Sequence, residues 1–193
     1  MYKSQMLLQR IACFAMIFAC ALVFIYSLGI TTDLYGNNFA YYAEDPDYPI
    51  VEGAQVYYNI QEFNRQLTGV GLIMIILAVV LLILQNHTRR KYYVANYVIV
   101  GVNVAASVAA TAWALPNIIK YKNEFLQVDF ETLDFMASQI LYHEWTDSTF
   151  WFDASFVVFP VLIVAALFLL FTTLFKVKVM KAEAEALSLG KEA

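Results

Sequence analysis

The sequence has few of the residues that catalysis and metal binding require. Its 193 residues include two histidines and two cysteines. His87 and His143 fall in different connecting segments, so they do not form a pair that could ligate haem within a membrane. Cys13 and Cys20 share the first apolar run and lie about two helical turns apart, too far to bridge within one helix. We therefore assign no catalytic, cofactor-binding or metal-binding residue and predict that the chain is not an enzyme.

Charge is absent from most of four long apolar runs, residues 11–30, 67–85, 94–115 and 155–177, and all 16 acidic residues lie outside them. At about 1.5 Å per residue, a run of about 20 residues spans the roughly 30 Å hydrocarbon core of a bilayer. The first run is longer than a signal-peptide core needs, so we interpret it as a retained helix. We predict an all-α integral membrane protein with a single membrane domain over 1–193, a four-transmembrane-helix bundle of two tandem helical hairpins.

The basic residues predict the orientation of these spans. Nine of the twelve Lys and Arg fall in the N-terminal segment, the link 86–93 and the chain from Lys176 onward. The intervening segments, 31–66 and 116–154, are acidic. By the positive-inside rule, the link, the tail 178–193 and both termini are cytoplasmic. The outer segments contain neither cysteine nor a glycosylation sequon, which favours a bacterial cytoplasmic membrane.

The two outer segments contain their own helical patterns. In 31–66 a proline-rich stretch is followed by an apolar stripe with helical spacing, formed by Val56, Ile60, Phe63 and Leu67. This stripe predicts an amphipathic helix that runs into the second span. A second helix is predicted in 116–154, from about Glu131 to Trp145, and we expect the two segments to pack into a partly helical extracytoplasmic cap. Tyr26, near the outer end of the first span, is expected to anchor at the interface.

The third run has two special faces when it is placed at 100° per residue. A polar face is formed by Asn96, Asn103, Ser107 and Thr111. A small-residue face on the opposite side is formed by Gly101, Ala105, Ala109 and Ala112. Small residues permit close helix contact, and intramembrane polar groups require hydrogen-bonding partners. The sequence does not decide whether the polar face is packed or hydrated, but neither face is typical of a lipid-facing surface.

Two other runs contain packing features. In the first run, small residues on one side oppose Phe14, Phe18 and Ile25, and they are Ala12, Cys13, Ala15, Ala19 and Cys20. In the fourth run Pro160 removes a backbone donor about one turn from the predicted outer end. It is either a tolerated proline near a helix start or a hinge.

The spans contain several faces suited to helix packing and no set of side chains suited to catalysis. Our leading hypothesis is therefore a non-catalytic membrane subunit. It would pack into a homo-oligomer or a larger membrane protein complex through the third helix and the acidic, aromatic cap. The alternative is a passive channel or small-solute transporter lined by the polar face, since no span contains an internal acid or histidine for ion coupling. We expect lipid and another membrane protein, or a second copy, as partners, no nucleic acid and no cofactor.

Overall fold

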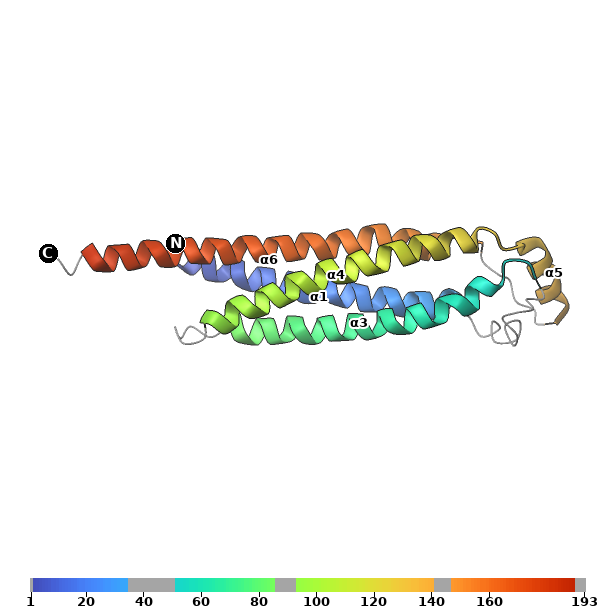
Figure 1. The fold of residues 1–193 in the computed structure, drawn as a ribbon, viewed down its shortest axis with the longest axis horizontal. Helices are drawn as coiled ribbons and strands as arrows, with labels where there is room; N and C mark the ends of the chain where they lie inside the picture. The colour runs from blue at the N-terminus through green and yellow to red at the C-terminus, as the bar shows by residue number, and fades with distance from the viewer. Residues whose placement is uncertain (1, 35–50, 86–92, 141–146, 190–193) are drawn as a thin grey trace. The chain divides into compact units, whose positions relative to one another are not determined.

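Four long helices make up most of the described chain (Figure 1). The computed structural model describes residues 2–34, 51–85, 93–140 and 147–189. The long helices are α1 (Tyr2–Leu34), α3 (Gln55–Gln85), α4 (Tyr93–Phe125) and α6 (Phe150–Leu189), and the shorter α5 covers Phe130–Ile140. Every regular element in these ranges is an α-helix, which confirms the predicted all-α class.

Each long helix contains a stretch that is long and apolar enough to cross a membrane. Within the described ranges these stretches are Ser4–Ile30, Gln55–Gln85, Val94–Phe125 and Phe150–Ala182. Each contains one of the four runs predicted from the sequence. Length and composition therefore support a membrane protein with four apolar helices.

The helices extend beyond the apolar runs because polar residues continue them. Pro116, the residue after the predicted third span, lies inside α4, which continues to Phe125. Pro160 lies inside α6, which begins at Phe150, so this proline occupies the helix interior and not its first turns. The helical stretch predicted from Glu131 to Trp145 begins one residue earlier, at Phe130, and is described as far as Ile140. Residues 141–145 lie outside the described ranges.

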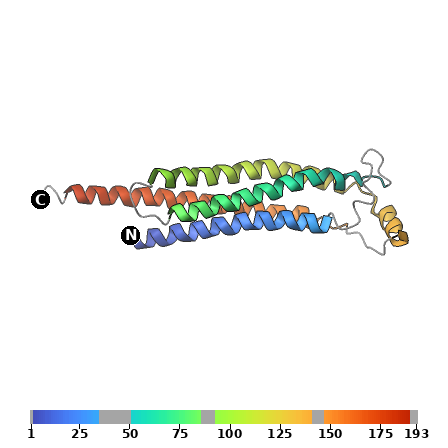
Figure 2. The same ribbon diagram turned by 90° about the horizontal axis from the view of Figure 1, so that it is seen from below.

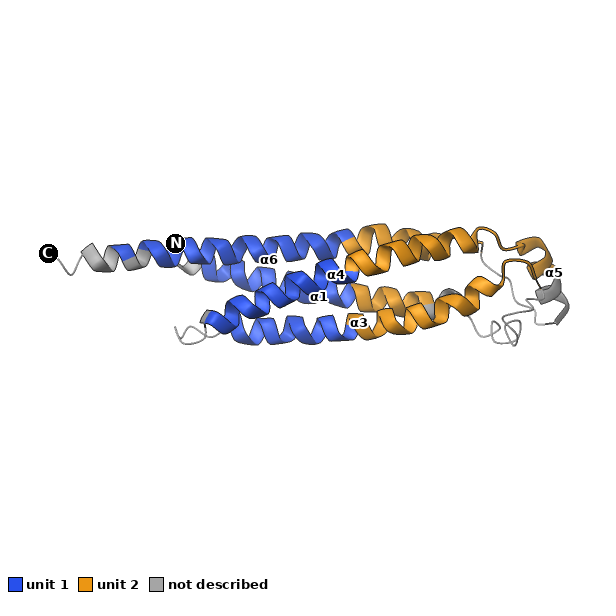
Figure 3. Cartoon of the chain, in the orientation of Figure 1, with its two compact units in different colours: residues 1–22, 72–110, 160–193 blue, residues 23–71, 111–159 orange. Residues whose placement is uncertain are grey.

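The chain divides into two compact units, shown in different colours in Figure 3. Unit 1 comprises Met1–Leu22, Leu72–Ala110 and Pro160–Ala193. Unit 2 comprises Val23–Gly71 and Thr111–Phe159. Each long helix contributes residues to both units, and α5 belongs to unit 2.

In unit 1, segments of the four long helices run side by side (Figures 1 and 2). Their buried positions recur at alternating spacings of three and four residues. On α1 these positions are Gln5, Gln9, Ala12, Met16 and Ala19; on α4 they are Asn96, Val100, Asn103, Ser107 and Ala110. The same spacing is found on α3 at Met74, Ala78 and Leu81, and on α6 at Leu162, Ala166, Leu169 and Thr173. This is the heptad-type spacing that keeps one seam of each helix against its neighbours.

The outward positions of unit 1 carry large apolar side chains. Phe14 and Phe18 on α1, Ile73 and Ile76 on α3 and Phe171 on α6 are all exposed. Small residues of the first run, including Ala12, Cys13, Ala19 and Cys20, are buried. A protein in water buries its large apolar groups, whereas lipid solvates them at no cost. The distribution therefore suits a bundle whose solvent is lipid.

Unit 2 has an aromatic interior built around Phe125. The Phe125 ring lies 6.0 Å from that of Tyr57, 5.1 Å from Phe130 and 5.2 Å from Phe152, measured between centroids. The predicted stripe of Val56, Ile60, Phe63 and Leu67 is buried along its whole length. Residues of the two predicted outer segments also meet through the backbone, since the amide of Asp129 donates to the carbonyl of Glu52 at 3.1 Å.

The side chain of Tyr26, which the sequence predicted as an interfacial anchor, is packed inside unit 2. It is 2% exposed, and its ring lies 6.5 Å from Trp151 and 6.2 Å from Phe159 between centroids. Gly29, one turn further along α1, leaves room for the Trp151 indole, because a Cβ at this glycine would overlap the ring. Aromatic packing therefore accounts for the surroundings of this ring.

Candidate functional site

The polar face of α4 is turned into the protein. Asn96, Asn103 and Ser107 are all buried in unit 1. Thr111 is half-buried and belongs to unit 2. Three of the four predicted polar residues therefore share one buried seam, in which each follows the heptad spacing of α4.

Asn103 and Ser107 use their side chains to bond to backbone carbonyls. Asn103 Nδ2 donates to the carbonyl of Ile99 at 2.8 Å and, between helices, to the carbonyl of Leu77 on α3 at 3.3 Å. Ser107 Oγ donates to the carbonyl of Asn103 at 2.8 Å. These bonds satisfy the donors of both side chains, so this part of the face serves helix packing.

A separate group of polar residues lies at the end of unit 1 where α3 ends and α4 begins. We call it the terminal polar cluster, and it consists of Gln5, Gln9, Gln85, Asn96 and Lys176. Gln85 links two helices: its Nε2 donates to the carbonyl of Asn96 at 3.2 Å, and its Oε1 accepts from Lys176 Nζ at 3.3 Å. Gln5 Nε2 donates to Gln9 Oε1 at 3.4 Å. Gln85 therefore joins α3 to α4 and α6, while the Gln5–Gln9 bond lies within α1.

Sequence reasoning identified Asn96 in this cluster but missed the other four members. They fall at the ends of the apolar runs, where polar residues are expected to face water or headgroups. Their spacing from the buried residues of each helix could have predicted that they are turned inward. Gln9 precedes Ala12 by three residues, Gln85 follows Leu81 by four, and Lys176 follows Thr173 by three, so each continues a heptad seam.

The small-residue face of α4 is turned outward. Gly101, Ala105, Ala109 and Ala112 are all exposed. A Cβ built at Gly101 meets no atom within 4 Å outside its own helical surroundings. The two faces that the sequence predicted on opposite sides of this helix thus have different environments: the polar face is packed, and the small-residue face is not covered by the described residues.

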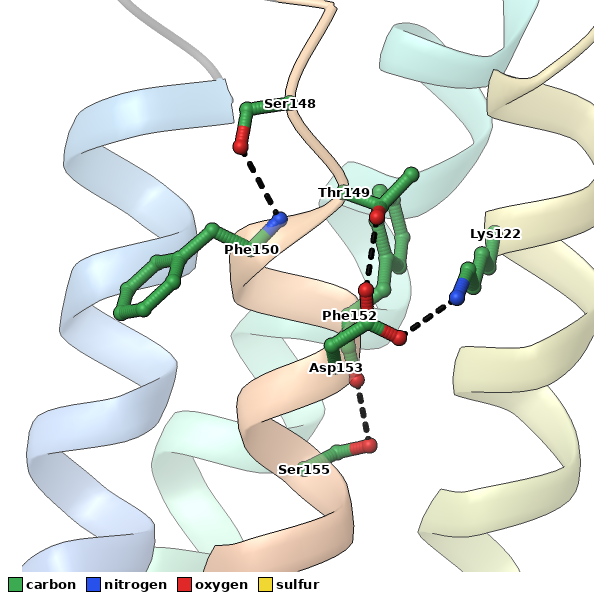
Figure 4. Close-up of polar contacts among 7 residues, drawn as sticks. All are labelled: Lys122, Ser148, Thr149, Phe150, Phe152, Asp153 and Ser155. Carbon is green, nitrogen blue, oxygen red and sulfur yellow. Dashed lines mark hydrogen bonds and ion pairs between the residues drawn. The ribbon is translucent and has the colours of Figure 1, made fainter.

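The start of α6 has a polar arrangement of its own (Figure 4). Asp153, in the first turn, accepts hydrogen bonds from Thr149 Oγ1 at 2.6 Å and from the ammonium of Lys122 on α4. Ser148 Oγ accepts from the amide of Phe150 at 3.2 Å. A carboxylate at a helix N-terminus is stabilised by the helix dipole, so helix capping accounts for this group.

The described residues contain no grouping of three or more His, Cys, Asp and Glu side chains that could hold a metal ion. His87 and His143 lie outside the described ranges. Comparison of the chain with protein-family models, with curated proteins and with solved structures finds no match. The site must therefore be interpreted from its own geometry.

Proposed function

We propose that this protein is a non-catalytic membrane subunit that binds another transmembrane helix through the small-residue face of α4. The observation that carries the proposal is the exposure of Gly101, Ala105, Ala109 and Ala112. The acidic, aromatic residues of unit 2 would add a second contact beyond the membrane. In this proposal both termini are cytoplasmic, as the positive-inside rule predicts.

Contrast with the other helices supports this role for α4. Outward positions elsewhere in unit 1 carry Phe, Ile and Leu side chains, which fill the space beside lipid tails. On α4 the outward side carries these four small residues together with Val94, Val98 and Val108, so shallow positions lie between the valines. Two helix backbones can approach closely over such a surface and gain van der Waals contact that lipid does not supply.

The rival function, a passive channel or small-solute transporter, needs polar groups that are free to contact a solute. The donors of Asn103 and Ser107 are already bonded to carbonyls within unit 1. Moving a solute along this face would break those bonds. The geometry therefore favours the subunit over the channel.

The test is the mass of the complex extracted directly into native nanodiscs, with its components identified by mass spectrometry. The chain has a mass of 22.0 kDa, and we expect a larger particle that contains either several copies or a second membrane protein. A Gly101→Leu/Ala105→Leu variant should reduce the particle to one chain. A Cβ added at Gly101 has open space around it, and Ala105 is exposed, so the fold of the single chain should survive.

Val164→Leu is the matched control, since Val164 is an outward residue of α6 outside the small-residue face. This variant should assemble like the wild type. A wild-type chain that is a lone monomer in native nanodiscs would reject the proposal. A flux assay on wild type and Asn103→Leu would then be the next experiment.

A further inference from the structure

The side chain of Asn96, in the first turns of α4, is buried in unit 1 with both of its polar atoms unsatisfied. This residue is 1% exposed. Among the described residues, neither its Nδ2 nor its Oδ1 has a hydrogen-bond partner. Buried side-chain amides in native proteins are almost always paired with protein groups or with ordered water. The amide of Asn96 therefore indicates that a molecule outside the chain lies against it.

Asn103 provides a direct comparison, because it is the same residue type on the same polar face of α4. It is 2% exposed. Its Nδ2 donates to the carbonyl of Ile99 at 2.8 Å and to the carbonyl of Leu77 at 3.3 Å, so both of its N–H donors are used. Burial is thus almost equal at the two asparagines, whereas their hydrogen bonding differs.

The two unsatisfied atoms of Asn96 restrict the chemistry of the molecule that binds there. The Nδ2 group donates and Oδ1 accepts, so the bound molecule must both accept and donate a hydrogen bond. A metal cation cannot accept from Nδ2, and a simple anion such as chloride cannot donate to Oδ1. Water does both with a single oxygen atom, and two polar partners are enough to hold a buried water.

The surroundings of Asn96 connect it with the surface of unit 1. Its backbone carbonyl accepts from Gln85 Nε2, and Gln85 Oε1 accepts from Lys176 Nζ. Gln85 and Lys176 are both half-buried, so polar groups extend from the surface to the backbone of Asn96. Further along α4, the donors of Asn103 and Ser107 are bonded to carbonyls. The polar surroundings therefore favour hydration at Asn96 and not at Asn103.

We propose that Asn96 forms a buried water-binding site at the start of α4, and that the neighbouring amide of Asn103 is dry. The bound water accepts a hydrogen bond from Nδ2 and donates one to Oδ1 of Asn96. The polar face of α4 is then hydrated at one end and held by protein hydrogen bonds in its middle. The site does not depend on the proposed assembly surface, because Asn96 is buried and Gly101 is exposed.

The test is NMR of asparagine side chains in the full chain, in phosphatidylcholine nanodiscs. Ala95–Asn96 is the only Ala–Asn pair in the sequence, and Val102–Asn103 is the only Val–Asn pair, so paired isotope labels identify each residue without a mutation. We expect magnetisation to pass from water to the Nδ2 protons of Asn96 and not to those of Asn103. In heavy water, the Asn96 amide should exchange about tenfold faster or more, because exchange at Asn103 must first break its two hydrogen bonds.

Asn103 is the matched control within the same sample, and an Asn96→Leu variant checks the assignment because only the Asn96 side-chain signals should vanish. The proposal is overturned if no magnetisation passes from water to the Asn96 amide. It is also overturned if the transfer comes from lipid headgroup protons in place of water. Equally fast exchange at Asn96 and Asn103 would overturn it as well, since the polar face would then be hydrated throughout.

Discussion

At the residue scale, Asn103 shows how one buried amide can join two helices. Its Nδ2 bonds to the carbonyl of Leu77 on α3 as well as to its own helix. Replacing it with leucine, Asn103→Leu, keeps the volume and removes both bonds. We expect the unfolding free energy to fall by about 1 kcal/mol, the size of an interhelical hydrogen bond in a membrane protein. Unfolding in mixed micelles measures the change, with Val164→Leu as the control; equal midpoints would mean that packing alone joins α3 to α4.

Glycine has a different role at two positions of unit 2. A Cβ at Gly29 would overlap the Trp151 indole, whereas a Cβ at Gly69 meets nothing within 4 Å. Gly29→Ala should therefore cost about 1–3 kcal/mol of unfolding free energy by overpacking. Gly69→Ala should be neutral or stabilising by up to about 1 kcal/mol, because alanine is the better helix former. The same unfolding assay compares the pair, and an equally stable Gly29→Ala would show that the indole has another place to pack.

Which residues share a face of α4 could be predicted from the sequence, but which face turns inward could not. The separation of Asn103 from Gly101 follows from the helical period alone. Polar and small faces are both suited to helix contacts, so the sequence does not show which of the two faces packs against the other helices. In the structure the polar face turns inward, since the Asn103 side chain bonds to α3.

At the element scale, α5 begins with a side-chain cap. Asp129 Oδ1 accepts from the amide of Thr132 at 3.1 Å, and Oδ2 accepts from its hydroxyl at 2.6 Å. These bonds hold the pKa of the Asp129 carboxyl below its ordinary value. The stabilisation is present at neutral pH and is lost as the pH falls through the lowered pKa, because the carboxylate is the better acceptor.

Asp129→Ala should therefore increase hydrogen exchange of the α5 amides at neutral pH, since alanine is a poor N-cap. Asp129→Asn is the matched control: asparagine caps as well as aspartate but does not titrate. Once intrinsic exchange rates are corrected for pH, acidification should loosen α5 in the wild type more than in Asp129→Asn. Identical pH profiles for the two proteins would show that the carboxylate does not stabilise this helix.

The positions of the long helices could be predicted from hydropathy, and the stripe that begins at Val56 also predicted the start of α3, but hydropathy did not predict that α4 continues to Phe125. An apolar run stops at the first polar residues, whereas a helix continues for as long as its backbone bonds are favourable. Glutamine, lysine and glutamate are good helix formers, so α3 starts at Gln55 and α6 continues to Leu189. Pro116 and Pro160 do not end their helices either, because the packing on both sides of each proline outweighs one missing backbone bond.

At the scale of the whole molecule, an even number of membrane crossings requires both termini to lie on one side. The basic residues predict that this side is the cytoplasm. We expect a cysteine introduced as Leu126→Cys, in the connection after α4, to react with a membrane-impermeant maleimide in intact bacterial spheroplasts. A cysteine introduced as Glu185→Cys, near the end of α6, should react only after lysis. Both parent side chains are exposed, so access to the reagent depends on the membrane alone.

The native thiols must be removed for this measurement, and the structure indicates that removal is safe. Cys13 and Cys20 are buried and free, and alanine already occupies neighbouring positions of the same seam at Ala12 and Ala19. If Glu185→Cys is labelled in intact spheroplasts and Leu126→Cys is protected, the orientation is opposite to the predicted one. Labelling of both would mean that α6, which connects the two positions, packs without crossing the bilayer.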